Sequence, residues 1–290
     1  MGKPHTLVAL IDNIGLFGGA TPNKQHVLLK GAVPVSAFMD MAEFKQVIDM
    51  PLLRRPYFTV MKEGVAADPE LVTRTERPGG NEVAGLANAA GIHAAMTRGG
   101  TVKLNQMEDW HKPSRDLVAE LGELIPAEIK SYVFFTPSQS RGTRPHRDAS
   151  HVIVVQLAGV KDWRLYAQPE HVSARSGLID VDLDDCSHRF TMEPGDLLYL
   201  PHGWPHVPHT RDQDSLHLTL TLTEPTPKDL VEALLETFRE DGQDLMGQQS
   251  RLYVEDKAEA VAKALSRHVL AVPEERILAA ALRRMRRRIT

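Results

Sequence analysis

The chain has 290 residues, of which 42% are hydrophobic and 25% are charged, and its 34 basic and 38 acidic residues give a net charge of −4. This length is enough for one large globular domain, or for one domain and a smaller companion, and the charge gives no reason to expect direct nucleic-acid binding. The single cysteine, Cys186, excludes an intramolecular disulfide and a zinc site built from several cysteines, which fits a reducing cytoplasm.

No targeting or membrane-spanning segment is apparent in the sequence. No stretch reaches the roughly 18 consecutive apolar residues that a bilayer-spanning helix needs. The first twenty residues lack the long apolar core and the cleavage site of a secretory signal. We therefore expect a soluble, cytoplasmic protein with no membrane partner.

Residues 1–94 combine helical and extended patterns, which predicts an α/β region beside the domain that follows. The stretch VSAFMDMAEFKQVIDM, residues 35–50, places apolar residues at helical spacing. The stretch RRPYFTVMKEG, residues 54–64, is typical of a strand that runs into a turn. Further along the chain, Ser114 is expected to cap a helix that ends before Pro126.

Between residues 131 and 224 the pattern changes to short apolar or alternating segments, separated by Gly and Pro. This pattern predicts an antiparallel sandwich or barrel. Residues 216–223, LHLTLTLT, alternate strictly, as a half-buried strand should. From residue 225 to the end the apolar spacing is helical. We therefore predict three parts: residues 1–94, a barrel at 95–224 and a helical region at 225–290.

Two motifs of the β region carry residues that can bind a metal. In RGTRPHRDAS, residues 141–150, His146 and Asp148 are two positions apart, so a strand would point both to the same side. On their own these residues could equally form an ordinary polar strand edge. The stretch EPGDLLYLPHGWPH, residues 193–206, matches the second motif of the cupin barrels and ends in His206.

Inside one barrel, His146, Asp148 and His206 would form a site of two histidines and one carboxylate. Such a site leaves open positions on one side of the metal, as non-haem Fe(II) oxygenases require, whereas a structural zinc site more often has four protein ligands. Three other histidines compete with His206 for the role of third ligand, but only His206 stands at the motif position; they are His202, His209 and His217.

The stretch GVKDW contains Lys161, fifteen residues after His146. A lone lysine there is ordinarily a surface residue. An inward-facing ammonium needs an anionic partner, because an unpaired buried charge is costly, and the distal carboxylate of 2-oxoglutarate would supply one. Thr143 could donate its hydroxyl to the same carboxylate, and Thr221 could line this pocket if residues 216–223 alternate as predicted.

These segments, in this order and at this spacing, resemble the JmjC-type cupin oxygenases of the ribosomal-oxygenase branch over roughly residues 95–225. The resemblance implies an α+β fold with a double-stranded β-helix, the cupin or jelly-roll barrel, as its core. It implies Fe(II) as cofactor, with 2-oxoglutarate and O2 as co-substrates, and His146, Asp148 and His206 as catalytic metal ligands. Tyr132 stands near a position at which some members have an asparagine.

The resemblance further implies hydroxylation of an Arg or His side chain of a ribosomal protein, and a homodimer formed through the helical region. The same chemistry on a small molecule, such as an amino acid or a natural-product intermediate, remains an alternative, as does a cupin-like binding protein without turnover. A cupin isomerase, or a dioxygenase without a co-substrate, would have no need of Lys161 or Thr143. The N-terminal part and the tail favour a macromolecular substrate, because they would build a wide cleft.

Overall fold

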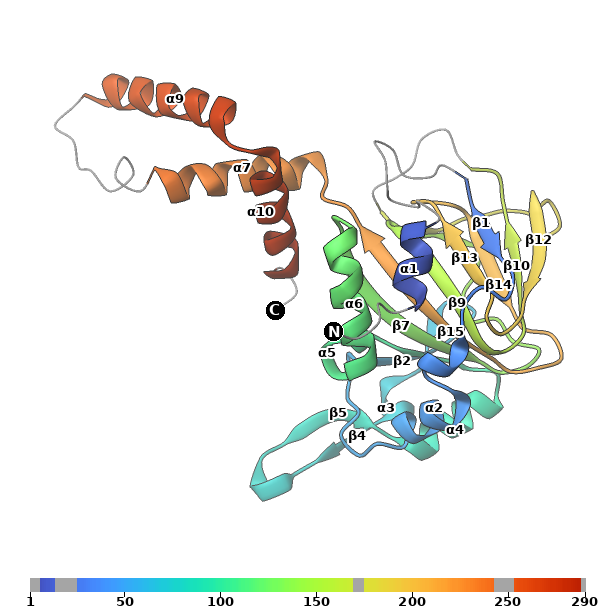
Figure 1. Ribbon diagram of the computed structural model, residues 1–290. Coiled ribbons are helices and arrows are strands. Elements are labelled where there is room, and N and C mark those ends of the chain that lie inside the picture. The colour runs from blue at the N-terminus through green and yellow to red at the C-terminus, as the bar shows by residue number, and fades with distance from the viewer. Residues whose placement is uncertain (1–5, 14–24, 169–174, 243–252, 288–290) are drawn as a thin grey trace. The chain divides into compact units, whose positions relative to one another are not determined.

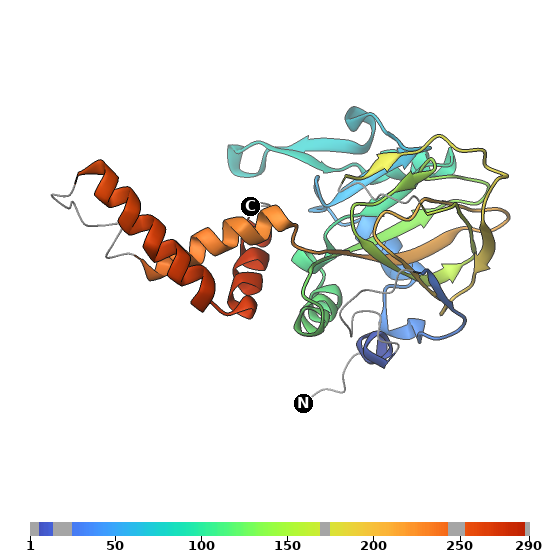
Figure 2. The ribbon, with the colours of Figure 1, turned by 90° about the horizontal axis from the view of Figure 1, so that it is seen from above.

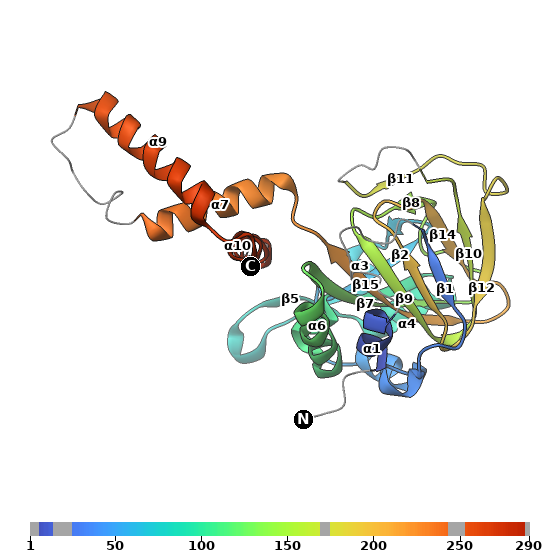
Figure 3. The ribbon, with the colours of Figure 1, turned by 45° about the horizontal axis from the view of Figure 1, so that its top comes forward.

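The computed structural model describes residues 6–13, 25–168, 175–242 and 253–287, and Figures 1, 2 and 3 show it in three orientations. Two compact units make up the chain. The first comprises residues 1–125 and 129–222, and the second comprises residues 126–128 and 223–290. The division into parts at residues 94 and 224 that the sequence suggests stays a prediction.

The first unit contains six α-helices in its described residues: α1 (Thr6–Asn13), α2 (Met41–Ile48), α3 (Pro69–Val72), α4 (Ala89–Thr97), α5 (Met107–Trp110) and α6 (Lys112–Leu124). Its strands up to the first histidine motif are β1 (Val27–Leu29), β2 (Phe58–Lys62), β3 (Val65–Ala66), β4 (Thr73–Glu76), β5 (Val83–Ala87), β6 (Thr101–Leu104) and β7 (Glu128–Thr136). The later strands are β8 (His146–Arg147), β9 (His151–Gly159), β10 (Lys161–Leu165), β11 (Gly177–Leu178), β12 (His188–Met192), β13 (Leu197–Leu200), β14 (His206–His209) and β15 (Ser215–Thr223).

Two antiparallel sheets form the barrel. The larger has eight strands in the order β1-β13-β9-β15-β7-β6-β2-β3, and the smaller has five in the order β11-β8-β14-β10-β12; a separate hairpin pairs β4 with β5. A buried apolar cluster joins side chains of both sheets and of the β13–β14 turn: Val152, Val154, Trp163, Leu165, Met192, Leu198, Leu200 and Trp204. The core therefore lies between the sheets, as alternation of inward and outward side chains requires.

Helices pack against the outer face of the larger sheet. Phe44 of α2 stacks on Phe135 of β7 with ring centroids 5.1 Å apart. Leu117 of α6 lines a small apolar cavity with Val133 and Leu218, which point outward from β7 and β15. In these strands the residues that face away from the barrel are also apolar, because helices cover them. The double-stranded β-helix with flanking α/β elements that the sequence predicts is confirmed.

Helix α6 begins three residues earlier than predicted. Its first residue is Lys112, and the residue that caps it is His111, whose side chain accepts a hydrogen bond from the backbone N–H of Ser114. The prediction that Ser114 is the cap was wrong. Pro113 explains the difference, because proline is favoured in the first turn of a helix, where its missing N–H would have no partner within the helix.

The second unit is helical, with α7 (Pro227–Asp241), α9 (Val254–Ala271) and α10 (Glu274–Arg287). Buried Ala233 of α7 packs against Ala280 and Ala281 of α10. Across the same contact, Arg284 of α10 forms ion pairs with two glutamates of α7, Glu232 at 2.6 Å and Glu236 at 2.8 Å. Among the described residues, no helix has both the length and the apolar run that crossing a membrane demands.

Candidate metal centre

Cross-strand pairing brings the two histidine motifs together. His146 of β8 lies directly opposite His206 of β14, and their rings are 4.3 Å apart, centroid to centroid. Asp148 follows two residues after His146, and its carboxylate Oδ2 is 3.9 Å from Nε2 of His146 and 3.6 Å from Nε2 of His206. The backbone N–H of Gly203, in the second motif, donates to the backbone carbonyl of Asp148 at 3.0 Å, which ties the two motifs together.

Backbone carbonyls fix which ring nitrogen of each histidine faces the carboxylate. Nδ1 of His146 is 2.9 Å from the carbonyl oxygen of Arg144, and Nδ1 of His206 is 2.8 Å from that of Trp204. A carbonyl oxygen can only accept, so Nδ1 of each ring carries a proton, and in the neutral form of the ring Nε2 keeps a lone pair. Metal-binding histidines use this arrangement to orient the ring and to hold one tautomer.

Electrostatics keeps His206 neutral at physiological pH. Burial, and to a smaller degree the neighbouring His146, lower the pKa of His206 to about 4, against the opposing effect of the Asp148 charge. The lone pair of Nε2 is therefore available to a cation rather than occupied by a proton. Within the described residues, His146, Asp148 and His206 are the only three His, Cys, Asp or Glu side chains whose possible ligand atoms all lie within 4.8 Å of one another.

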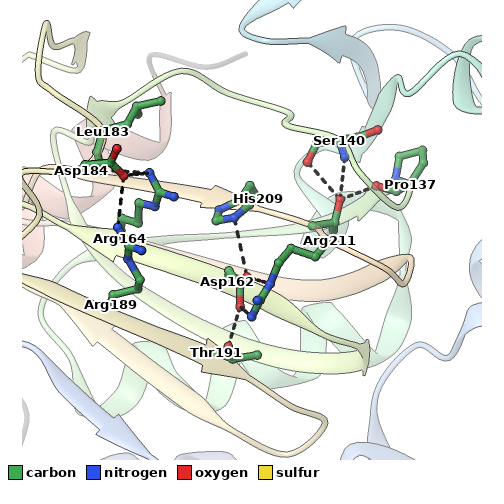
Figure 4. Close-up of polar contacts among 11 residues, drawn as sticks. Pro137, Ser140, Asp162, Arg164, Leu183, Asp184, Arg189, Thr191, His209 and Arg211 are labelled. Carbon is green, nitrogen blue, oxygen red and sulfur yellow. Dashed lines mark hydrogen bonds and ion pairs between the residues drawn. The ribbon is translucent and has the colours of Figure 1, made fainter.

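The three rival histidines are held elsewhere. His209 contacts Asp162, with Nε2 3.6 Å from its carboxylate, in a cluster with Arg211 and Thr191 (Figure 4). His202 donates its backbone N–H to Nδ1 of His151. His217 is buried inside the barrel, where its ring stacks on Phe134 at 5.0 Å.

Lys161 is the main buried cation of the first unit. Lys161 is only 1% exposed to solvent. Its ammonium donates one hydrogen bond, of 2.6 Å, to the hydroxyl of Thr136. Burial lowers the pKa of Lys161 to about 7. Among the described residues it forms no ion pair, so an anion that enters the barrel would supply the counter-charge that the protein lacks.

The remaining predicted residues have different surroundings. The hydroxyl of Thr143 is buried and has no hydrogen-bond partner within the described residues. Thr221 of β15 lies opposite Val152 of β9, on the inward-facing side of the larger sheet. Arg144, in the first histidine motif, lines a cavity of about 480 Å³ with Arg141 and Glu63.

Sequence reasoning missed two residues of the interior. Thr136 ends β7 and receives the only hydrogen bond of Lys161 among the described residues. Lys103 of β6 lies opposite Phe134 of β7. β6 lies before residues 131–224, where the pattern of short alternating strands was found, so the strand register was needed to place both residues.

A comparison with known families and proteins matches residues 106–230 to the family described as "JmjC domain". The "Bifunctional lysine-specific demethylase and histidyl-hydroxylase NO66" of Drosophila persimilis is 29% identical over 187 residues, which are 63% of this chain and 26% of that protein. "Ribosomal oxygenase 1" of Homo sapiens is 38% identical over 125 residues, which are 41% of this chain and 20% of that protein. The chain thus spans about a fifth to a quarter of the length of these relatives.

Solved structures of YcfD from Escherichia coli share the fold. One has a TM-score of 0.55 at 16% identity and covers 87% of this chain and 66% of that chain. Another, described as a ribosomal oxygenase in complex with cobalt and succinic acid, has a TM-score of 0.51 at 14% identity and covers 87% of this chain and 65% of that chain. The resemblance predicted from the motifs is confirmed by these similarities together with the JmjC match.

Proposed function

We propose that this chain, whose residues 106–230 form a JmjC domain of the ribosomal-oxygenase type, is an Fe(II)- and 2-oxoglutarate-dependent hydroxylase of a protein side chain. One observation carries the proposal: the buried ammonium of Lys161, which has no ion pair within the described part of the chain, shares the barrel interior with three convergent side chains that can bind a metal. Trp163 lies between them, because it is two residues from Lys161 on β10 and its ring is 5.7 Å from that of His206.

The donor set fits Fe(II). Two neutral imidazoles and one carboxylate are ligands that this ion accepts, and three ligands leave positions for a co-substrate and for O2. His146, Asp148 and His206 would hold the metal. With 2-oxoglutarate and O2 it would supply the oxidation that turns a substrate C–H into C–OH while 2-oxoglutarate becomes succinate and CO2.

The interior polar groups fit 2-oxoglutarate. Lys161 would pair with its distal carboxylate, and the hydroxyl of Thr136 would hold the ammonium in place. Thr143, whose buried hydroxyl has no partner among the described residues, would donate to the same carboxylate, and Thr221 would line the pocket. The surrounding apolar side chains exclude water, which strengthens each of these charged contacts.

The substrate and the assembly are part of the proposal. The names of the relatives, which include a histidyl-hydroxylase and ribosomal oxygenases, support a ribosomal protein as partner and a His side chain as target. An Arg side chain is the other target that the resemblance of the motifs implies. We further propose a cytoplasmic homodimer formed through the helical unit, without direct nucleic-acid binding.

The test is succinate formation by the purified protein with Fe(II), ascorbate and 2-oxoglutarate, in the absence of any other substrate. The wild type should form succinate slowly, and His146→Ala should lose at least 90% of this rate, because one of three metal ligands is gone. His209→Ala is the matched control, since His209 contacts Asp162 outside this group, and it should keep the wild-type rate.

Direct 2-oxoglutarate binding covers the case in which uncoupled turnover is too slow to detect. The wild type loaded with metal should bind 2-oxoglutarate, and Lys161→Ala should bind it at least tenfold more weakly, because the buried carboxylate would lose its ion pair. A wild type that neither forms succinate nor binds 2-oxoglutarate would rule out the proposed function.

A further inference from the structure

A second lysine, the half-buried Lys103, faces the interior of the barrel. In the antiparallel pair β6–β7 it lies directly opposite Phe134, and residues directly opposite one another share a face of the sheet. Two residues earlier on the same face, the hydroxyl of Thr101 donates to Thr136 at 3.1 Å. Thr136 in turn accepts from Lys161, so the face that carries Lys103 is the one that lines the candidate co-substrate site.

Aromatic rings connect Lys103 to the candidate metal centre. Its ammonium lies over the ring of Tyr132, 4.0 Å from the centroid, and 5.2 Å from the centroid of Phe134. Phe134 stacks on His217, whose ring is 6.1 Å from that of Trp163. The ring of Trp163 in turn lies 5.7 Å from that of His206.

The direct contacts of the Lys103 ammonium are with aromatic faces. Among the described residues it forms no hydrogen bond and no ion pair, and it is partly exposed. Burial lowers its pKa, and the negative charge of Asp148 opposes that shift. Asp148 is thus near enough for the two charges to interact, although its carboxylate would be bound to the metal.

Two physical consequences follow for a substrate side chain that approaches the metal. A second cation beside Lys103 is repelled, and the repulsion is strong where protein rather than water surrounds the charges. The ammonium of Lys103 also covers the face of Tyr132. A substrate guanidinium therefore cannot make a cation–π contact with that ring, a contact that would stabilise its binding. A side chain with a free hydrogen-bond acceptor gains a donor instead.

We propose that Lys103 is a charge filter of the substrate site, which rejects arginine and selects a side chain that accepts a hydrogen bond and carries no positive charge. Neutral histidine and the carboxylate of aspartate share this chemistry. The inference rests on the proposed function, and it deepens that function by separating the two target side chains, Arg and His, that the proposed function includes. Lys103 selects by rejection as well as by attraction, which is how specific sites usually discriminate.

The experiment measures binding of three blocked amino acids, with acetylated N-termini and methylamidated C-termini, by ligand-observed NMR. The probes are the derivatives of histidine, aspartate and arginine at pH 8, where histidine is neutral. The protein is the full chain with Zn(II) in place of iron and with 2-oxoglutarate, so no turnover occurs. The variants are Lys103→Met and Lys103→Glu, and Lys45→Met, an exposed lysine of α2, is the matched control.

Wild type and Lys45→Met should bind the histidine and aspartate derivatives at least tenfold more tightly than the arginine derivative. Lys103→Met should lose this preference, and Lys103→Glu should invert it in favour of arginine. An inverted preference distinguishes a charge filter from a structural role of Lys103, because loss of a structural role would weaken the binding of all three probes alike. If Lys103→Glu does not fold, the loss of preference in Lys103→Met decides.

The inference is overturned if wild type binds arginine as tightly as histidine, if no probe binds at millimolar concentration, or if Lys103→Met keeps the preference. Binding of 2-oxoglutarate to the wild type is measured first. A wild type that does not bind 2-oxoglutarate contradicts the proposed function, whereas one that binds it and shows no charge preference contradicts the charge filter alone. A preference for aspartate over histidine would identify an acidic target, and the reverse would identify a neutral one.

Discussion

Lys161 shows how one residue can lower stability and serve binding. An ammonium in the interior without a counter-ion costs free energy, and the pKa of about 7 expresses that cost, because the charged form is disfavoured in the folded protein. Burial of this kind is retained where a ligand needs it. Two consequences can be measured, one for binding and one for folding.

The affinity for 2-oxoglutarate should fall as the pH rises above about 7. The free protein then holds Lys161 increasingly uncharged, so binding a carboxylate must first restore the proton, and the limiting slope is about tenfold per pH unit. Calorimetric dissociation constants between pH 6.5 and 8.5 would measure it. Lys161→Arg keeps its charge in this range and should give a flat profile; a flat profile for the wild type would contradict the explanation.

Lys161→Met should raise the melting temperature of the ligand-free protein near pH 7. The folded pKa of about 7 lies below the ordinary value of 10.5, so between these values the unfolded chain binds more protons than the folded one. The resulting destabilisation is complete below about pH 7 and disappears as the pH rises towards 10.5. Lys161→Met removes this destabilisation. 2-Oxoglutarate should also no longer raise the melting temperature of this variant. A lower melting temperature for Lys161→Met than for Lys45→Met would show that Lys161 stabilises the fold.

The three side chains that converge at the candidate metal centre could be identified from the sequence, and the groups around them only in part. His146, Asp148 and His206 lie in short motifs, where spacing along one strand or turn decides which way a side chain points. Lys103 and Thr136 depend on how β6 pairs with β7, two strands separated by residues 105–127, which include helices α5 and α6. The register between strands so far apart in the sequence depends on long-range packing, and a local sequence pattern does not determine it.

Among the elements, strand β9 ends at a glycine that the fold cannot easily replace. Gly159 has a φ of +62°, in the left-handed region that favours glycine. It joins β9 to β10, and its position opposite Ser215 of β15 brings it close to the backbone of the neighbouring strand. A Cβ atom at Gly159 would lie 1.7 Å from the carbonyl oxygen of Asp214, so the two strands could not keep their present spacing.

Gly159→Ala should therefore lower the free energy of unfolding by about 2 to 4 kcal/mol, the range of strained backbone combined with a steric clash. Gly177→Ala is the control, because a Cβ there meets nothing within 4 Å and its φ is not positive. Denaturant titration of both variants would measure the difference. Equal stability of the two variants would show that the β9–β10 turn can move away from β15.

The extent of the larger sheet was harder to predict than its individual strands. Residues 151–159 and 215–223 have apolar or alternating patterns and form strands over those ranges. The expected N-terminal flank, however, contributes β1 to one end of the sheet and β2 and β3 to the other. Their pairing with β13 and β6 spans large sequence distances, so local periodicity identifies the strand at residues 58–62 without showing that it extends the barrel sheet.

At the scale of the whole molecule, the candidate site and the helical unit are separate in sequence. Every proposed metal and co-substrate residue lies within residues 136–221 of the first unit. The helix α9 of the second unit, and the residue that precedes it, expose large apolar side chains: Tyr253 at 81%, Val254 at 76%, Val261 at 38%, Val269 at 48% and Leu270 at 89%. Exposed apolar residues along one helix are typical of a surface that a second chain covers.

If α9 forms the proposed dimer contact, a charge in its middle should dissociate the dimer without affecting the chemistry. Val261→Glu would bury an unpaired carboxylate in the contact, which costs several kcal/mol and should lower the association constant at least a hundredfold. Ser266→Glu adds the same charge at a polar, exposed position of the same helix and should leave association unchanged. Sedimentation equilibrium would compare the variants, and both should form succinate at the wild-type rate because the metal ligands lie in the other unit. A wild type that sediments as a monomer would show that these side chains have another role.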